Sequence, residues 1–107
     1  TDCTLGNGSA GTNCSSDRRL KENIRPIAGA LEKILSLSGV EFVWNSLATR
    51  PGREDIGVIA QEVEKVFPTA VVSHPETGYK MVDYAVLVSP LIESTKELHR
   101  MCAMQEE

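Results

Sequence analysis

The sequence predicts an α+β fold, a small domain of short strands and helices followed by a long C-terminal helix. Apolar residues recur at helical spacing in two separate stretches, residues 27–35 and 59–67. Three short runs rich in β-branched residues lie between and after these stretches and are bounded by turn residues. From residue 84 to the end the apolar pattern is helical again.

Length and composition indicate one globular domain with a thin core. The chain has 107 residues, of which 41% are hydrophobic and 24% are charged. A net charge of −4 gives no electrostatic footprint for nucleic acid, and acidic residues flank the basic residues within 18–25. No apolar run approaches the length of a membrane span. We therefore expect no nucleic-acid partner and no membrane insertion.

The first sixteen residues are rich in Gly, Ser and Thr and contain one large apolar residue, Leu5. Such a segment cannot bury enough surface to fold alone, so we interpret residues 1–15 as the end of an upstream segment. The chain begins without Met in a polar stretch, and we expect it to be part of a longer protein.

The three cysteines do not indicate a metal site. Cys3, Cys14 and Cys102 form no Cys-x-x-Cys pair, and we expect no bound metal and no cofactor. Cys3 and Cys14 could close a loop by a disulfide in an oxidising compartment, or remain free thiols. Cys102 falls on an apolar helical face and is expected to be a small core residue.

The first helix should start at Pro26 and end at Ser38-Gly39, because Pro favours helix starts and Gly favours helix ends. Its apolar face is expected to consist of Ile27, Leu31, Ile34 and Leu35. A strand at Val40–Trp44 and a loop at Asn45–Arg53 should follow it.

A second helix is expected within residues 55–68, preceded by an extended Ile56–Val58 in which Gly57 permits close packing. Pro68 should stop this helix. The helix has its apolar face at Ile59, Val63, Val66 and Phe67. Residues 71–74 and 80–83 read as strands joined by a turn, and His74 beside that turn is expected to have a turn or surface role.

The C-terminal helix carries mostly apolar residues at alternating steps of four and three, a heptad pattern in which Thr95 and Gln105 are polar. The members of this seam are Tyr84, Val88, Leu91, Thr95, Leu98, Cys102 and Gln105. Pro90 should either kink the helix or lie in the first turn of a new helix that Ser89 caps. The seam fits a packed core helix and an oligomerising coiled coil equally well.

Ser16 and Lys21 form a candidate nucleophile and base. A serine hydroxyl needs a base nearby, and a lysine amine can serve when burial or neighbouring cations favour its neutral form. The five-residue spacing does not make the two side chains neighbours on one helix. Contact within one chain therefore requires a turn or break between them, and the alternative is a lysine that acts on the serine of another subunit.

Three blocks in order strongly resemble the peptidase S74 family, the C-terminal intramolecular chaperone domains of phage tailspikes, endosialidases and tail fibres. The blocks are Ser16–Ile24, Gly57–Val63 and Val82–Ile92. The resemblance implies a trimeric α+β module that assembles an upstream β-rich fibre or adhesin and then releases itself by cutting its own chain. It places the chaperone domain at 16–107, with 84–107 as a trimerisation helix.

The resemblance also implies roles for single residues. Ser16 would be the nucleophile and Lys21 its base in an autoproteolytic serine endopeptidase, with Asp17 and Asn23 shaping the site. The seam residues Tyr84, Val88, Leu91, Thr95, Leu98 and Cys102 would form the interface of a homotrimer. The implied location is a phage virion tail fibre or a bacterial cell-surface or extracellular fibre. Two alternatives are a non-cleaving trimeric cap or adhesive tip that stays attached, and a partner-binding helical module.

Overall fold

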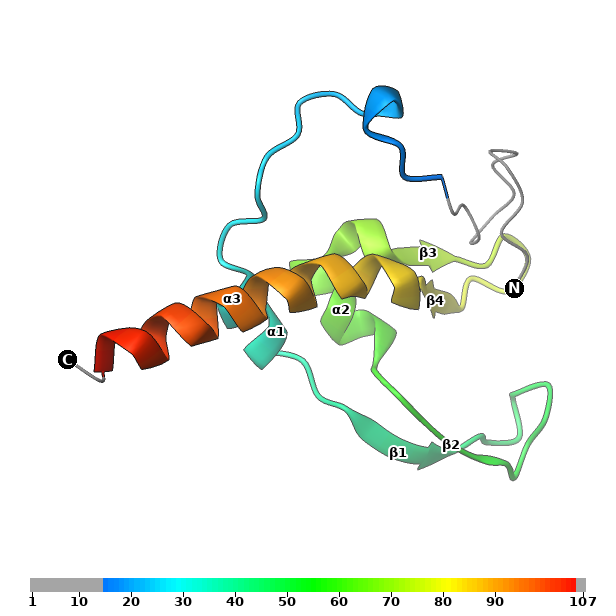
Figure 1. Cartoon of the computed structure of the whole chain (residues 1–107). Coiled ribbons are helices and arrows are strands. Elements are labelled where there is room, and N and C mark those ends of the chain that lie inside the picture. Colours follow the sequence, from blue (N-terminus) through cyan, green and yellow to red (C-terminus); the bar gives the residue numbers. More distant parts are fainter. Residues whose placement is uncertain (1–14, 106–107) are drawn as a thin grey trace.

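The computed structural model describes residues 15–105, so the predicted Cys3–Cys14 pairing and the leader 1–14 lie outside the described residues. Three helices and two small antiparallel sheets make up the fold, and the predicted α+β class is confirmed. Figure 1 shows the long helix α3 (Val88–Gln105) crossing the molecule, with an N-terminal arm on one side and a hairpin on the opposite side.

The N-terminal arm, residues 15–29, leads into α1 (Ala30–Leu35), which is shorter than predicted. Gly29 lies in the left-handed region (φ 66°), so the helix starts at Ala30, four residues after the predicted start at Pro26. Ser36 caps the other end, and the prediction of a glycine stop at Gly39 is wrong. Leu35, the last residue of the helix, is 73% exposed and does not belong to the apolar face.

Two strands form the first hairpin, β1 (Val40–Val43) and β2 (Glu54–Gly57), which pair antiparallel with Val40 opposite Gly57. The predicted strand and loop are confirmed, except that Trp44 already belongs to the loop. The indole N–H of Trp44 donates to Asp55 across the hairpin at 3.2 Å. In Figure 1 this β1–β2 hairpin stands apart from the helices.

The second hairpin follows α2 (Ala60–Val66) and a 3-10 turn (Pro68–Ala70). The helix stops before Pro68 as predicted, although Ile59 precedes it and is 41% exposed. The strands β3 (Val71–Ser73) and β4 (Lys80–Val82) pair antiparallel, as the sequence predicted. His74 Nδ1 accepts backbone N–H groups from the following turn at 3.2 and 3.3 Å, which confirms its turn role.

A small core lies where α2, the second hairpin and the start of α3 meet. Val63, Ala70 and Leu87 are its buried centre, with partly buried aliphatic residues around them. Among residues 15–105 only one further hydrophobic residue, Ala30, is buried. The thin core predicted from the length of the chain is therefore present, and many large apolar side chains remain exposed.

A 3-10 turn (Tyr84–Leu87) capped by Asp83 leads into α3, which continues without a break through Pro90. Pro90 lies in the first turn of α3 and is buried, as one of the two alternatives expected, but Ser89 is itself helical and does not cap the helix. The capping oxygen comes from Asp83, which accepts the backbone N–H of Ala85 at 3.2 Å. Pro90 and Ser94 are the buried residues of the helix, which packs against α1.

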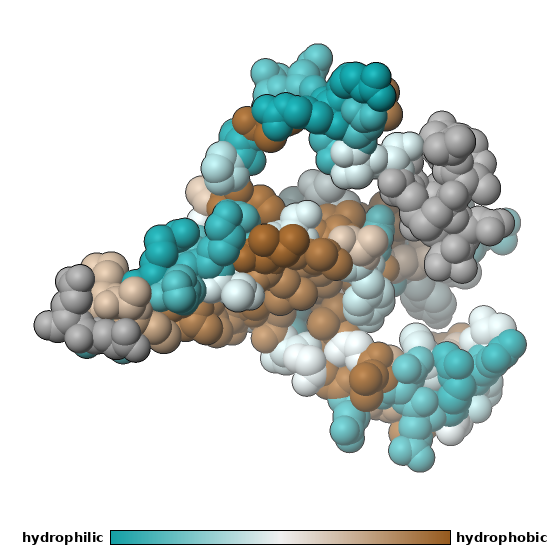
Figure 2. Space-filling view, viewed as in Figure 1, coloured by the Kyte–Doolittle hydropathy of each residue, from teal (hydrophilic) through white to brown (hydrophobic). Residues whose placement is uncertain are grey.

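The heptad seam lies on an exposed face of α3. The exposed fractions of Val88, Leu91 and Leu98 are 54%, 49% and 51%. Cys102 is exposed as well, and its prediction as a core residue is wrong, because the core ends before the last turns of the helix. Figure 2 shows apolar side chains gathered along the middle of α3 between the polar arm and the polar rim of the hairpin.

Candidate functional site

Ser16 and Lys21 meet on the N-terminal arm. Lys21 Nζ donates a hydrogen bond to Ser16 Oγ at 2.8 Å. A 3-10 turn at Arg18–Leu20 lies between them and folds the chain back, so the five-residue spacing becomes a side-chain contact. Of the two routes that the sequence left open, the structure has the contact within one chain.

Asp17 holds that turn in place. Its carboxylate accepts the Arg19 backbone N–H at 2.8 Å, which caps the 3-10 turn. The Arg19 guanidinium also donates to both carboxylate oxygens, at 3.1 and 2.9 Å. These side-chain bonds, followed by the backbone bond, hold the pKa of Asp17 below its usual range. The carboxylate is therefore engaged with Arg19 rather than with the lysine.

Asn23 bends the arm just after Lys21. Its φ is 55°, in the left-handed region that Asn tolerates better than most residues with a side chain. Arg25 Nη1 reaches the Asn23 carbonyl oxygen at 3.4 Å. Asp17 thus caps the turn between Ser16 and Lys21, and Asn23 bends the backbone just after Lys21.

The Ser16–Lys21 pair is exposed in the single chain. In the observed bond the amine donates to the hydroxyl, whereas a general base must accept the hydroxyl proton. Water favours the charged amine, and removing water favours the neutral one. The arm therefore brings the two side chains into hydrogen-bonding contact. It does not exclude water from them.

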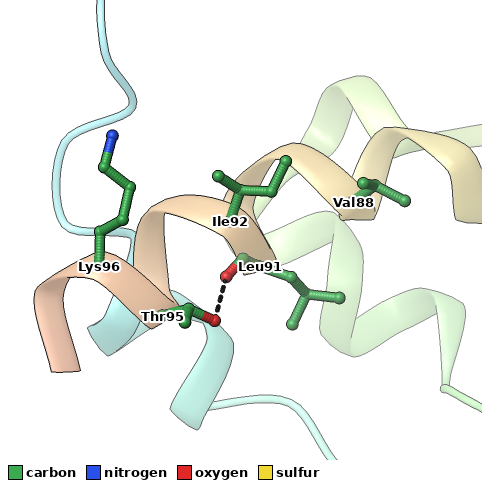
Figure 3. A pocket seen from close by; sticks show the side chains of 5 residues that line it. All are labelled: Val88, Leu91, Ile92, Thr95 and Lys96. Carbon is green, nitrogen blue, oxygen red and sulfur yellow. Dashed lines mark hydrogen bonds between the residues drawn. The ribbon is translucent and has the colours of Figure 1, made fainter. Parts of the chain in front are cut away.

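A shallow apolar hollow lies on the seam of α3. Its volume is about 400 Å³, and five residues of one helix line it (Figure 3): Val88, Leu91, Ile92, Thr95 and Lys96. Thr95 Oγ1 donates to the Leu91 carbonyl oxygen at 2.9 Å. Because this hydroxyl is satisfied within the helix, a polar residue in the seam can face an apolar partner at little cost.

Glu97 has a role that the sequence did not reveal. Its Oε2 atom accepts the backbone N–H of Leu31 at 2.9 Å, across 66 residues of sequence. The N-cap of α1 is Gly29, which has no side chain to offer, so a carboxylate of α3 caps α1 instead. A glycine before a helix indicates an open cap, but sequence alone does not identify the distant residue that fills it.

Tyr84 joins the β1–β2 hairpin to the base of α3. Its hydroxyl oxygen accepts the Val58 backbone N–H at 3.3 Å. The close approach expected at Gly57 is present, since a Cβ there would lie 2.6 Å from that hydroxyl. The ring is nevertheless 55% exposed and faces a groove beside the hairpin.

Residues 15–105 contain neither a group of side chains suited to hold a metal ion nor a helix suited to span a membrane. No three His, Cys, Asp or Glu side chains in this range are grouped so that they could hold a metal ion. None of the helices described in that range is long and apolar enough to cross a membrane.

The fold and the site define a class of small α+β modules with a Ser–Lys pair on an N-terminal arm and an exposed apolar face on a long C-terminal helix. Residues 16–72 match the family model of peptidase S74, described as the chaperone of endosialidase. The chain belongs to this family, because the match covers 57 of its 107 residues. It begins at Ser16 and includes the first two sequence blocks, whereas the third lies beyond it. A search of curated proteins found no match to the chain.

Membership of this family supports a chaperone role for the chain.

Proposed function

We propose that the chain is an intramolecular chaperone that trimerises through α3, drives assembly of an upstream β-rich fibre or adhesin, and cuts its own chain next to Ser16. In this scheme residues 1–15 end the upstream fibre segment, residues 16–107 form the chaperone, and 84–107 form the trimerisation helix. The family description supports the association with a fibre. We infer a location on a phage tail fibre or on a bacterial surface fibre.

The observation that carries the cleavage proposal is the 2.8 Å contact between Lys21 Nζ and Ser16 Oγ. Once neutral, the amine takes the hydroxyl proton as Oγ attacks the carbonyl carbon of a peptide bond flanking Ser16. The C–N bond breaks, and the leaving nitrogen takes the proton back from the lysine ammonium. Water then hydrolyses the ester and frees the hydroxyl. The step needs neither metal nor cofactor.

The exposed seam of α3 supports the trimer. Its apolar members Val88, Leu91 and Leu98 are each about half exposed in the single chain, although they follow a heptad pattern. A three-chain bundle would bury them together with Tyr84, Thr95 and Cys102. Three chains held in register would also remove most of the entropy cost of finding one another before an interwoven fibre forms. Cutting the chaperone away afterwards makes the fibre kinetically stable.

The cleavage proposal is tested with the full-length protein on a denaturing gel and by mass spectrometry of the fragments. The unmodified protein should split next to Ser16, and Ser16→Ala should abolish the split. Lys21→Arg is the sharpest variant at the base, since it keeps the charge but cannot lose a proton. Ser38→Ala, at an exposed serine outside the arm, is the matched control and should still cleave. An unmodified protein that stays intact would refute self-cleavage.

A second candidate function is a non-cleaving trimeric cap or adhesive tip that remains on the fibre. The exposure of the Ser16–Lys21 pair favours it, because the single chain does not exclude water from the pair. The same gel separates the two functions, since the cap predicts a trimer whose chains stay full length.

A further inference from the structure

An open groove of about 510 Å³ lies between the β1–β2 hairpin and the base of α3. The residues that form it include Val40, Glu41, Ile56, Gly57, Val58 and Tyr84. Ile56 belongs to strand β2 and is 73% exposed. The groove thus presents aliphatic side chains, one aromatic ring and one carboxylate to an occupant.

The N-terminal arm carries the complementary features. Leu20 and Ile24 are 74% and 55% exposed, and they flank Lys21 in sequence. The arm, residues 15–29, holds four cations against two acids, and one of these acids, Asp17, is paired with Arg19. Glu41 lines the groove, whereas Asp55 on the facing strand is paired with Arg53 of the same hairpin. Exposed apolar side chains of the arm therefore match an apolar groove wall, and the groove offers the carboxylate of Glu41 to an arm of net positive charge.

The arm cannot use the groove of its own chain. In Figure 1 the arm arches out on one side of α2 and α3, and the β1–β2 hairpin lies on the opposite side. A second copy is the occupant that the molecule offers, because Tyr84 belongs both to the groove and to the seam of α3. A copy that packs on the seam is therefore brought to the edge of the groove.

We propose that the arm of one copy docks in the β1–β2 groove of a second copy, with Leu20 and Ile24 against its aliphatic wall. The inference rests on the proposed trimer and identifies what completes the Ser–Lys site. The second copy covers the exposed pair and excludes water, which favours the neutral lysine that a general base requires. Cleavage then depends on a neighbour rather than on the arm alone.

Cross-linking between two differently tagged chains tests the contact. Both chains carry Ser16→Ala, which keeps the arm attached, and Ser in place of all three native cysteines. One chain also carries Leu20→Cys and the other Ile56→Cys, and the two are co-expressed and oxidised mildly. Leu47→Cys replaces Ile56→Cys in the control, since Leu47 is 72% exposed on the same hairpin but lies outside the groove. We expect about tenfold more cross-linked dimer with Ile56→Cys, because a disulfide forms only when the Cα atoms lie within about 7 Å.

Cleavage of the full-length protein provides a second readout. Ile56→Ser should slow the cut about tenfold, as expected for loss of one buried aliphatic contact, and Leu47→Ser should leave it unchanged. If Ile56→Cys and Leu47→Cys give equal amounts of cross-linked dimer while the protein has the mass of a trimer, the docking is refuted and the trimer is not. A single chain that carries both Leu20→Cys and Ile56→Cys can also be oxidised. If no cross-linked dimer forms, the proposed docking is likewise refuted. A monomeric mass by light scattering would overturn the docking and the proposed trimer together.

Discussion

Replacing Glu97 by Ala should destabilise the fold by removing the cap of α1. The Glu97 carboxylate accepts the Leu31 backbone N–H at 2.9 Å in a partly buried position. Loss of an N-terminal cap costs about 0.5–2 kcal/mol, and a charged acceptor places this bond toward the upper end. For a domain of this size, 1 kcal/mol corresponds to a fall in Tm of about 4–8 °C. We therefore expect Glu97→Ala to lower Tm by about 5–12 °C.

The assay is thermal unfolding of the uncut Ser16→Ala protein at one fixed concentration, because assembly would make Tm depend on concentration. Glu93→Ala is the control one turn earlier on α3. It breaks only an ion pair with Lys96 at 3.4 Å, and surface pairs contribute about 0–1 kcal/mol. Glu97→Gln keeps an acceptor oxygen and should lower Tm by about half as much as Glu97→Ala does. An equal fall in Tm for Glu97→Ala and Glu93→Ala would refute the capping role.

Three further predictions test the groove, the seam and the turn. Gly57→Ala should lower the free energy of unfolding by about 1–3 kcal/mol in denaturant titration, since its Cβ would meet a tyrosine hydroxyl at 2.6 Å. Gly39→Ala should not lower it, because nothing lies within 4 Å there. Leu91→Asn should reduce the assembled mass measured by light scattering, while Leu35→Asn should not, although Leu35 is the more exposed. The lowered pKa of Asp17 means that its cap is fully present above the usual Asp range and is lost as pH falls through the lowered value. NMR titration of that carboxyl should show this midpoint, and a midpoint at the usual Asp value would contradict the cap.

The sequence predicted strands and turns better than helix ends. The second hairpin follows from short runs with β-branched residues and from turn residues, and these signals are local. For the first hairpin the sequence predicted β1 and the loop but not the pairing with β2. The start of α1 was misplaced because Pro26 and Gly29 both punctuate the chain, and only the left-handed φ of Gly29 decides between them. Cys102 was misplaced for a different reason, since periodicity shows which residues share a face but not what covers that face.

The candidate site was predictable as a set of residues but not as a geometry. Ser16 and Lys21 stand out by type and by family resemblance, yet their spacing argued against contact. The contact forms because Asp17 caps a single 3-10 turn, and a turn this short leaves almost no sequence signature. Glu97 was missed because its partner is 66 residues away. Long-range pairs of this kind are set by packing rather than by local pattern.

The core of the single chain is small, and apolar side chains on both α3 and the arm remain exposed. Among the described residues, four hydrophobic side chains are buried, whereas Val88, Leu91 and Leu98 on α3 and Leu20 and Ile24 on the arm are each about half exposed or more. A domain of this size needs most of its apolar surface covered to fold stably alone. Covering both surfaces with other copies would supply that burial and would dry the Ser16–Lys21 pair in the same step. Stability and cleavage should therefore rise together with protein concentration, because both draw on the same contacts.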